Sequence, residues 1–530
     1  MCLSPPDRSK PVASELEVKD LSVFAGTNVL LDAISCSVRA GELVAVVGRS
    51  GSGKTMLTKA IMGLLPSGVQ AAGQILLDGQ RLDTLGERDM DAVRGKKIGM
   101  LFQQPKRVMN PRMTVGAHLL EAMGATGFRK PKNAQKRIES LLQEVGLSPA
   151  AEVSRMRPDQ LSGGMAQRVM LAIALAADPA YVLADEPTSS LDSILKAEIL
   201  DLLRRRQLER GLGILLITHD IASVQHIADR VIVISDGAIV DQCPTSAMFS
   251  APRHEKTREL ISATASVIRE VQEITTHCVL RADSVGKNYT RRAKGAAALN
   301  PTSLSLHAGE VLGVVGRSGS GKSTFARLLA GLEQPTHGNI TGLTEGSQPT
   351  GVQIIPQEPF GSFDPALDLR TSLMAAVHRL PDSEAAELIE GAVDRVGLPV
   401  RLLERLPTQC SGGQLQRMAI ARALLVKPDV LICDESTSAL DSVAQRHILD
   451  LLLQLREDMG ISLMVISHDM DVIRYVSDRV AVFYAGNLVE IKPLTQFLTA
   501  PEHPHSQQLV RALDKGIGYS GLALDKTPAV

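Results

Sequence analysis

The sequence predicts an α/β protein built as a tandem repeat, each half with a parallel sheet covered on both faces by helices. The stretch VVGRSGSGK occurs at residues 46–54 and again, letter for letter, at residues 314–322. Further motifs recur downstream at a constant offset of 249 residues. In both halves, short apolar runs alternate with helical segments, a pattern typical of strand–helix–strand units around a parallel sheet.

Length and composition restrict the possible classes of protein. A chain of 530 residues is too long for one core. Its 57 basic and 58 acidic residues nearly cancel, which disfavours nucleic-acid binding driven by phosphate neutralisation. The six cysteines are scattered without a CxxC pair, which argues against a zinc site, a disulfide framework or an iron–sulfur cluster. We see neither a secretion signal nor an apolar run of the roughly 18–20 residues needed to span a bilayer, so we expect other chains to supply any membrane part.

The repeat extends well beyond the opening stretch. Three motif pairs lie 249 residues apart: LSGGMAQR with CSGGQLQR, ADEPTSSLD with CDESTSALD, and LLITHD with MVISHD. The segment QILLDGQRL of the first half has no counterpart in the second, which predicts a trimmed surface subdomain there. We predict a first domain at 14–265, a polar linker at 266–279, a second domain at 280–515 and a tail at 516–530.

Each copy of the opening stretch fits a phosphate-binding P-loop, because it follows an apolar strand and opens a helix. Glycines let backbone N–H groups turn inward around phosphates, and the helix N-terminus favours negative charge. We expect Lys54 and Lys322 to reach the β- and γ-phosphates, and the hydroxyls of Thr55 and Ser323 to bind Mg²⁺. The predicted phosphate-binding residues are Gly48, Ser50, Gly51, Ser52, Gly53, Lys54 and Thr55, with Gly316, Ser318, Gly319, Ser320, Gly321, Lys322, Ser323 and Thr324.

Acidic, amide and imidazole side chains follow later strands of both halves. An aspartate at a strand end suits Mg²⁺, and the glutamate after it can polarise the attacking water. A loop glutamine can sense the metal or the water, and a histidine can contact the γ-phosphate. Each signal alone is also common in surface turns, but their order relative to the P-loop favours function. The predicted catalytic residues are Glu186, Glu435, His219, His468, Gln103 and Gln357, and the predicted metal ligands are Thr55, Gln103, Asp185, Ser323, Gln357 and Asp434.

The SGG triplets predict a second anion site in each half. A serine and two glycines at a helix start expose backbone N–H groups to phosphate. One nucleotide does not need two phosphate sites from one half, so we infer that each triplet addresses the nucleotide of the other half. The residues are Ser162, Gly163 and Gly164 in the first half and Ser411, Gly412 and Gly413 in the second.

This set of motifs resembles the ATP-binding cassette (ABC) ATPases over about residues 14–263 and 280–513. The resemblance implies an α/β fold of tandem P-loop NTPase domains, each with a parallel-sheet core, an antiparallel β subdomain and a helical subdomain. It implies ATP and Mg²⁺ as cofactors, ATP hydrolysis, and two cassettes that pair within the chain. Each ATP would lie between the P-loop of one cassette and the SGG of the other.

Several positions depart from the family pattern. Cys410 stands where leucine is usual, and Ser436 replaces the proline after the glutamate. Tyr289 matches the aromatic residue that stacks on adenine, whereas Ala25 occupies the aligned position in the first half. We expect both sites to be active, and these differences leave open whether the two sites are equivalent.

Two function classes remain, a transport motor and a soluble tandem ABC ATPase acting on ribosomes or nucleic acid. The long charged linker and the zinc-binding cysteines of the soluble types are missing from the sequence, which favours the motor. The segments MFSAPRHEKTREL and FLTAPEHPHSQQL resemble the ends of cassettes in the peptide/nickel importer family. The resemblance implies two integral-membrane permease subunits, an extracytoplasmic substrate-binding protein, no direct contact with cargo, no nucleic acid, and a peripheral location at the cytoplasmic face of the inner membrane.

The cargo stays open between peptides and nickel or other metal chelates. A C-terminal tail without cysteine is closer to the nickel branch, since many peptide cassettes carry a cysteine-rich tail. We interpret His503 and His505 as part of a surface tail motif rather than a metal site, because no further ligands lie at metal spacing.

Overall fold

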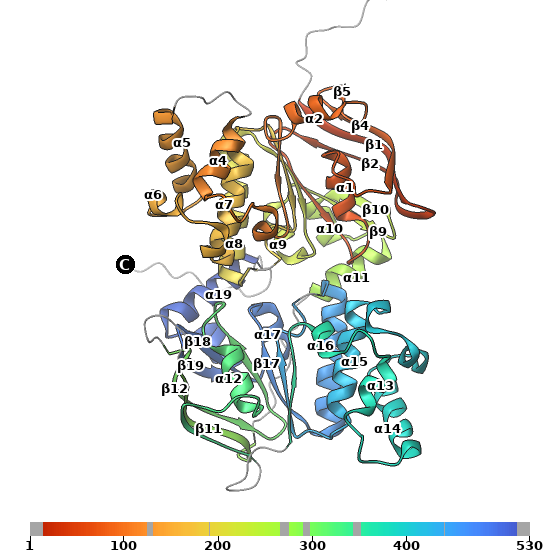
Figure 1. The fold of residues 1–530 in the computed structure, drawn as a ribbon, viewed down its shortest axis with the longest axis vertical. Helices are drawn as coiled ribbons and strands as arrows, with labels where there is room; N and C mark the ends of the chain where they lie inside the picture. Colours follow the sequence, from red (N-terminus) through yellow and green to blue (C-terminus); the bar gives the residue numbers. More distant parts are fainter. Residues whose placement is uncertain are drawn as a thin grey trace, which may run out of the picture. The chain divides into compact units, whose positions relative to one another are not determined.

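A computed structural model describes residues 14–124, 131–189, 191–264, 275–289, 297–342, 351–438 and 440–516. The chain divides into two units, and we call residues 14–264 the first cassette and residues 275–516 the second (Figure 1). Strand β11 begins at Cys278. Most of the predicted linker (residues 266–274) and of the predicted tail (residues 517–530) lies outside the described residues.

The core of the first cassette is a six-stranded sheet in the order β10-β9-β3-β8-β7-β6. The strands β6, β7, β8, β3 and β9 run parallel, and β10 is the antiparallel edge. Every residue of β3, β7 and β8 is buried, as expected for parallel strands covered on both faces. The bounds are β3 Leu43–Val47, β6 Ile98–Leu101, β7 Tyr181–Asp185, β8 Gly213–Ile217, β9 Arg230–Ser235 and β10 Ala238–Pro244.

The second cassette repeats this sheet in the order β15-β16-β17-β13-β18-β19. The parallel pairs and the antiparallel edge recur at equivalent places. The bounds are β13 Val311–Val315, β15 Val352–Ile355, β16 Val430–Asp434, β17 Ser462–Ile466, β18 Arg479–Tyr484 and β19 Asn487–Pro493. The predicted parallel core is therefore confirmed in both halves.

Each cassette also carries an antiparallel sheet, and the two sheets differ in size. The first has the order β2-β1-β4-β5, with β1 Glu15–Ala25, β2 Asn28–Arg39, β4 Val69–Leu77 and β5 Gln80–Arg81. The second has the order β12-β11-β14, with β11 Cys278–Lys287, β12 Leu299–His307 and β14 His337–Thr341. The segment QILLDGQRL forms the end of β4, the turn and β5. The described residues of the second cassette contain three such strands, and residues 343–350, where a counterpart of β5 would fall, lie outside the described residues.

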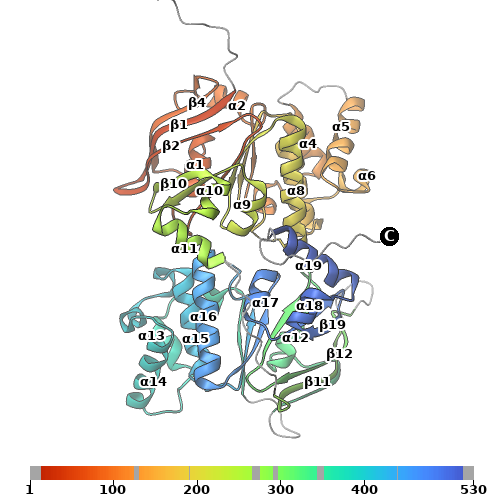
Figure 2. The same cartoon turned by 180° about the vertical axis from the view of Figure 1, so that it is seen from behind.

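Helices of the first cassette cover the sheet and form a separate subdomain. Figures 1 and 2 both show α4, α5 and α6 gathered on the side away from β1 and β2. The bounds are α1 Lys54–Ile61, α2 Glu87–Val93, α3 Pro105–Val108, α4 Val115–Gly124, α5 Pro131–Glu144, α6 Ala150–Val153, α7 Gly163–Leu175, α8 Ser193–Arg210, α9 Ile221–Ile227, α10 Thr245–Ser250 and α11 Glu255–Thr264, with a 3₁₀ turn at Pro158–Gln160. One apolar cluster joins this subdomain to the sheet, and a second lies under the antiparallel sheet.

The second cassette has the same helical plan. The helices α13, α14 and α15 lie on the side opposite β11 and β12 in both views. The bounds are α12 Lys322–Leu329, α13 Leu369–Met374, α14 Asp382–Arg395, α15 Gly412–Leu424, α16 Ser442–Met459, α17 Met470–Val476, α18 Leu494–Thr499 and α19 Pro504–Gly516, with 3₁₀ turns at Pro359–Ser362, Val400–Glu404 and Pro407–Gln409. Among the described residues, no helix is long and apolar enough to cross a membrane.

Unusual backbone conformations recur at matching positions in the two cassettes. Glu186 and Glu435, 249 residues apart, have φ of 45° and 47°. This left-handed region is costly for residues other than glycine, and such residues concentrate at functional sites. The repeat is therefore preserved in the fine backbone geometry as well as in the order of strands.

Candidate nucleotide-binding and catalytic sites

The first phosphate loop joins β3 to α1 and folds back on its own lysine. Lys54 Nζ donates to the carbonyl oxygens of Gly48 and Arg49, both at 2.8 Å, although the residue is only 5% exposed. A Cβ on Gly48 would lie 2.1 Å from the carbonyl oxygen of Ile234, so only glycine fits there. Gly53 precedes the helix with φ of 95°, which also favours glycine.

The second phosphate loop joins β13 to α12 with the same geometry. Lys322 Nζ donates to the carbonyl oxygens of Gly316 at 2.7 Å and Arg317 at 3.1 Å. A Cβ on Gly316 would lie 2.1 Å from the carbonyl oxygen of Phe483. Both loops therefore hold a buried cation at the start of a helix, an arrangement that suits a polyphosphate.

In each cassette, two of the three residues predicted to hold Mg²⁺ are hydrogen-bonded to each other. Thr55 Oγ1 donates to Asp185 Oδ1 at 3.1 Å, and Ser323 Oγ donates to Asp434 Oδ1 at 3.0 Å. Burial raises the pKa of Asp185 to about 6 against the opposing effect of the Thr55 bond, and burial also raises the pKa of Asp434. Oxygen ligands are those that Mg²⁺ prefers, and a divalent cation would offset the cost of a buried carboxylate, so the residues fit the ion.

A glutamine and a histidine converge on each predicted glutamate. In the first cassette Gln103 Nε2 donates to Glu186 Oε2 at 2.6 Å, and His219 Nδ1 lies 3.6 Å from Glu186 Oε1. In the second, Gln357 Nε2 donates to Glu435 Oε2 at 3.1 Å. The same carboxylate oxygen lies 3.2 Å from Nδ1 of His468.

The charge on the two glutamates is fixed by these neighbours. Burial raises the pKa of Glu186, but its contacts with His219 and the charge of Lys54 outweigh burial, so the net shift is downward. The pKa of Glu435 is lowered by the same balance, with His468 and Lys322 opposing burial. Both glutamates are therefore carboxylates at neutral pH, able to accept a hydrogen bond from water and orient it.

The SGG triplets begin long helices on another part of each cassette. Ser162 caps α7 by accepting from the backbone N–H of Met165 at 3.2 Å, and Ser411 caps α15 by accepting from that of Gln414 at 3.3 Å. In Figures 1 and 2 the helical subdomain, which contains α7, lies on the opposite side of the cassette from α1. The P-loop and the SGG of one cassette are therefore separate features.

Sequence reasoning missed polar contacts that depend on residues outside the motifs. Gln414 Oε1 accepts from the backbone N–H of Ser411 at 2.9 Å, which completes a capping box in the second cassette. The first has Met165 at that place, and the change from LSGGM to CSGGQ was the available signal. Glu333, which accepts from the Tyr289 hydroxyl at 2.6 Å, lies outside every motif.

The interpretation of His505 as a surface residue was wrong. Its exposure is 3%, and its ring centroid lies 4.8 Å from that of Tyr484. The motif turns the chain into α19, and His503 Nδ1 accepts from the backbone N–H of His505 at 3.1 Å. Within the described residues, no group of three or more His, Cys, Asp or Glu side chains could hold a metal ion.

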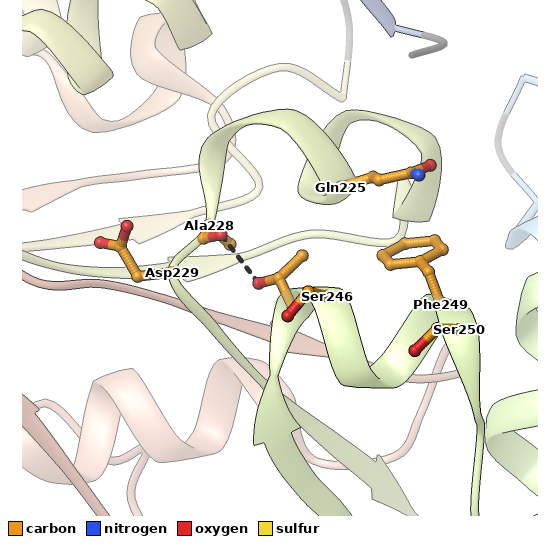
Figure 3. Close-up of a pocket in the computed structure, with 7 residues that line it drawn as sticks. Gln225, Ala228, Asp229, Ser246, Phe249 and Ser250 are labelled. Carbon is orange, nitrogen blue, oxygen red and sulfur yellow. Dashed lines mark hydrogen bonds between the residues drawn. The ribbon is translucent and has the colours of Figure 1, made fainter. Parts of the chain in front are cut away.

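A pocket of about 600 Å³ in the first cassette lies between α9 and α10. Figure 3 shows Gln225 on α9 and Phe249 on α10 among the lining side chains. The Thr245 hydroxyl, also in the lining, donates to the carbonyl oxygen of Ala228 at 2.7 Å. None of its lining residues belongs to the predicted nucleotide site. The pocket is a separate surface feature.

The chain is similar to known proteins over most of its length. The family model described as ABC transporter matches residues 31–189 and 299–438. The chain is 35% identical to the glutathione import ATP-binding protein GsiA of Pectobacterium atrosepticum, over 95% of this chain and 90% of that protein. It is 35% identical to GsiA of Escherichia coli (strain K12), over 91% of this chain and 86% of that protein.

Among solved structures, an archaeal ribosome recycling factor in complex with a ribosomal stalk protein is 24% identical, with a TM-score of 0.62 over 89% of this chain and 90% of that one. At this identity the likeness shows the fold alone. Both halves match the family model, and each brings together a phosphate loop, an Asp–Glu pair, a glutamine and a histidine. The chain therefore belongs to the ABC transporter family, as an ATP-hydrolysing protein with two ATP-binding cassettes on one polypeptide.

Proposed function

We propose that the chain is the motor subunit of a binding-protein-dependent ABC importer and uses both of its cassettes to hydrolyse ATP. The observation that carries this proposal is the duplicated site, in which every predicted catalytic side chain meets its partners. The 35% identity to import ATP-binding proteins, over nearly their whole length, supports the assignment to import. The alternative of a soluble ATPase acting on ribosomes has only a likeness of fold in its favour.

The protein's own residues have separate roles in the proposed reaction. Lys54 and Lys322 bind the β- and γ-phosphates, and the N–H groups of each loop surround them. Thr55 with Asp185, and Ser323 with Asp434, would hold Mg²⁺, and the ion would supply positive charge against the negative charge of the phosphates. Glu186 and Glu435 orient the attacking water.

The glutamines connect hydrolysis to movement. Gln103 and Gln357 lie in loops after β6 and β15, and each donates a hydrogen bond to the catalytic glutamate. A loop that swings would break this bond and change the carboxylate's partners. His219 and His468 favour the ionised state of the glutamates and would contact the γ-phosphate.

We further propose that each ATP-binding site is completed by the SGG triplet of the other cassette. Ser162, Gly163 and Gly164 would serve the nucleotide at Lys322, and Ser411, Gly412 and Gly413 the nucleotide at Lys54. The separation of α1 from the helical subdomain within the first cassette supports this pairing, because one cassette does not bring its own triplet to its own loop.

The proposed partners are two permease subunits in the inner membrane and an extracytoplasmic binding protein, with this chain peripheral on the cytoplasmic side. The relatives are named for glutathione, a tripeptide, which favours small peptides over metal chelates as cargo. The sequence-based leaning towards the nickel branch thus has less support than the peptide alternative.

The decisive experiment is reconstitution of the chain with its permeases and binding protein in liposomes. We expect ATP-dependent uptake of a small peptide, with glutathione, dipeptides and a nickel chelate compared as labelled cargo. The double variant Glu186→Gln/Glu435→Gln is the control for ATP-driven uptake. Uptake of the nickel chelate alone would overturn the peptide assignment, and ATP turnover without uptake of any of these would overturn the importer assignment.

A further inference from the structure

A charged and aromatic cluster stands beside the second phosphate loop. The Tyr289 hydroxyl donates to Glu333 Oε2 at 2.6 Å. Lys287 Nζ lies 3.4 Å from the same oxygen and 5.4 Å from the centroid of the Tyr289 ring. Arg327 Nη1 lies 3.5 Å from Glu333 Oε1. Glu333 is thus the centre of the cluster, with one acceptor oxygen shared by the tyrosine and the lysine.

The cluster ties the tyrosine ring to the helix that begins at the phosphate loop. Arg327 is on α12, and Glu333 follows that helix. The Thr324 hydroxyl, next to the predicted metal ligand Ser323, also hydrogen-bonds to Tyr289. Tyr289 is nevertheless 36% exposed, so part of its ring is available to a ligand. The base of a nucleotide whose phosphates lie at this loop would therefore contact a Tyr289 ring whose position is already fixed by hydrogen bonds.

The first cassette replaces the three main members of the cluster with apolar residues. Strand register aligns Lys287, which pairs with Leu299, with Val23, which pairs with Leu31. Two residues further on, Tyr289 corresponds to Ala25. Counting from the loop lysines, Glu333 corresponds to Leu65. Val23 is fully buried and Leu65 packs on the apolar cluster under the antiparallel sheet.

We propose that Glu333 is a positioning residue that holds the Tyr289 ring for stacking on the nucleotide base at the second phosphate loop. The second site then draws part of its affinity from the base, and the first site depends on the phosphates. This inference rests on the proposed function, in that it requires ATP to bind at both loops. The inference goes further than the proposed function in two respects. The nucleotide affinity of the two sites depends unequally on the base, and Glu333 is one cause of that difference.

The physical reason is preorganisation. Stacking of a base on an aromatic side chain contributes affinity for any base, since every base has a π-face. An exposed tyrosine that must first be ordered loses part of that gain to side-chain entropy. The hydrogen bond from Tyr289, followed by the smaller effects of Lys287 and Arg327, keeps the pKa of Glu333 below its usual range, so the acceptor stays charged. A charged acceptor makes the stronger hydrogen bond.

The test isolates each site and removes the base from the ligand. Full-length Glu186→Gln/Glu435→Gln protein, which we expect not to hydrolyse ATP, carries Lys54→Ala to leave the second site or Lys322→Ala to leave the first. Calorimetry with Mg²⁺ then gives the affinities of ATP and of inorganic tripolyphosphate. We expect the ratio of the two affinities to be about tenfold larger at the second site than at the first.

Variants of the second site test the role of Glu333. Tyr289→Ala and Glu333→Ala should each lower the ratio several-fold, by weakening ATP binding and leaving tripolyphosphate binding unchanged. Glu333→Gln, whose amide oxygen can still accept from the hydroxyl, should recover most of the loss. Glu387→Ala, an exposed position on α14, is the matched control and should change neither affinity.

A double-mutant cycle separates positioning from a general structural effect. In the Tyr289→Ala background, Glu333→Ala should have no further effect on the ratio. An equal effect in both backgrounds, or a Glu333→Gln variant as weak as Glu333→Ala, would overturn the proposal. Equal ratios at the two sites would also overturn it while leaving two ATP sites in place. Loss of all nucleotide binding in the Lys54→Ala and Lys322→Ala proteins would instead contradict the proposed function.

Discussion

The two cassettes have an aspartate at an equivalent position, and different side chains bind it in each. Asp229 and Asp478 each accept a hydrogen bond from the first N–H of a central strand, at 2.9 and 2.8 Å. In the first cassette, Asp229 is held by Gln207 and by Arg204, each at 2.9 Å. In the second, Arg456 alone replaces both, at 2.8 Å from Asp478.

The difference shows that both cassettes keep a cation beside this aspartate, although a different residue supplies it in each. Arg456 aligns with Gln207, and the residue that aligns with Arg204 is Leu453. The cation has therefore moved three positions along one helix, about one turn, and still reaches the same carboxylate. Two cassettes with the same backbone can thus differ in which residues are indispensable.

The largest expected effect concerns the two glutamates proposed to be catalytic. We expect Glu186→Gln and Glu435→Gln each to lower ATP turnover about 100-fold or more, because an amide orients water poorly. Binding of ATP should be retained, since neither residue lies in a phosphate loop. Steady-state ATPase assays and equilibrium nucleotide binding measure the two quantities.

The comparison between the two glutamates is the informative part of this experiment. Equal losses would show that the cassettes work as one unit. If one variant kept wild-type turnover, the glutamate assignment in that cassette would be wrong. Thr188→Ser and Thr437→Ser, conservative changes two residues beyond the glutamates, are matched controls and should preserve most of the activity.

The second expected effect tests the proposed pairing of the SGG triplet of one cassette with the phosphate loop of the other. Ser411→Arg should disable the nucleotide bound at Lys54, and Ser162→Arg the nucleotide bound at Lys322, because a bulky cation would occupy the place of the γ-phosphate. Site-resolved trapping of a photoreactive ATP analogue, followed by proteolysis between the cassettes, measures each site. The reverse pattern would contradict the cross-cassette pairing.

The third effect is on stability and concerns the exchanged cation. Arg456 and Asp478 are 5% and 3% exposed, so Arg456→Gln leaves a buried carboxylate without its main cation. We expect a loss of about 2–4 kcal/mol in the free energy of unfolding of the second cassette. Leu453→Arg in the same chain should restore part of it by recreating the arrangement of the first cassette.

Denaturant unfolding measures these values, with Glu387→Gln as an exposed control. A double variant that is no more stable than Arg456→Gln alone would show that the two arrangements are not interchangeable.

The smallest effect concerns the carboxylate that holds α19. Glu490, 8% exposed, accepts from the backbone N–H groups of Glu502 at 2.9 Å and His503 at 3.0 Å. Burial raises its pKa, but these bonds and the neighbouring polar side chains, Lys492 among them, outweigh burial, so the net shift is downward. Glu490→Gln should cost about 1 kcal/mol of unfolding free energy at pH 7.

The sign of its pH dependence follows from the lowered pKa. The carboxylate stabilises the fold above the ordinary glutamate pKa, and this contribution is lost as the pH falls through the lower, folded-state value. The difference between wild type and Glu490→Gln should therefore shrink below about pH 4.5. Asp241, the equivalent residue of the first cassette, accepts from Thr257 at 3.1 Å, and Asp241→Asn should have the smaller effect. Thermal unfolding across pH 4–8 distinguishes them.

The sequence was informative wherever chemistry demands a particular residue at a fixed spacing. The meeting of Thr55 with Asp185, and of Ser323 with Asp434, was predictable because the chemistry proposed for metal binding restricts residue type, and the parallel core followed from buried apolar runs. Contacts between segments far apart in the chain were not predictable in the same way. Tyr289 and Glu333 are 44 residues apart, and only the fold brings them together. The burial of His505 was missed because a polar motif near the chain end favoured a surface position.

The left-handed backbone of Glu186 and Glu435 sets a limit on engineering this chain. A residue with a Cβ is strained at φ near 45°, and glycine would relax the backbone there. Selection for heat resistance alone would therefore reward the loss of both glutamates, and a library screened only for folding would drift towards inactive proteins. Both halves keep a glutamate in a backbone conformation that is unfavourable for it. This indicates selection for activity rather than for stability.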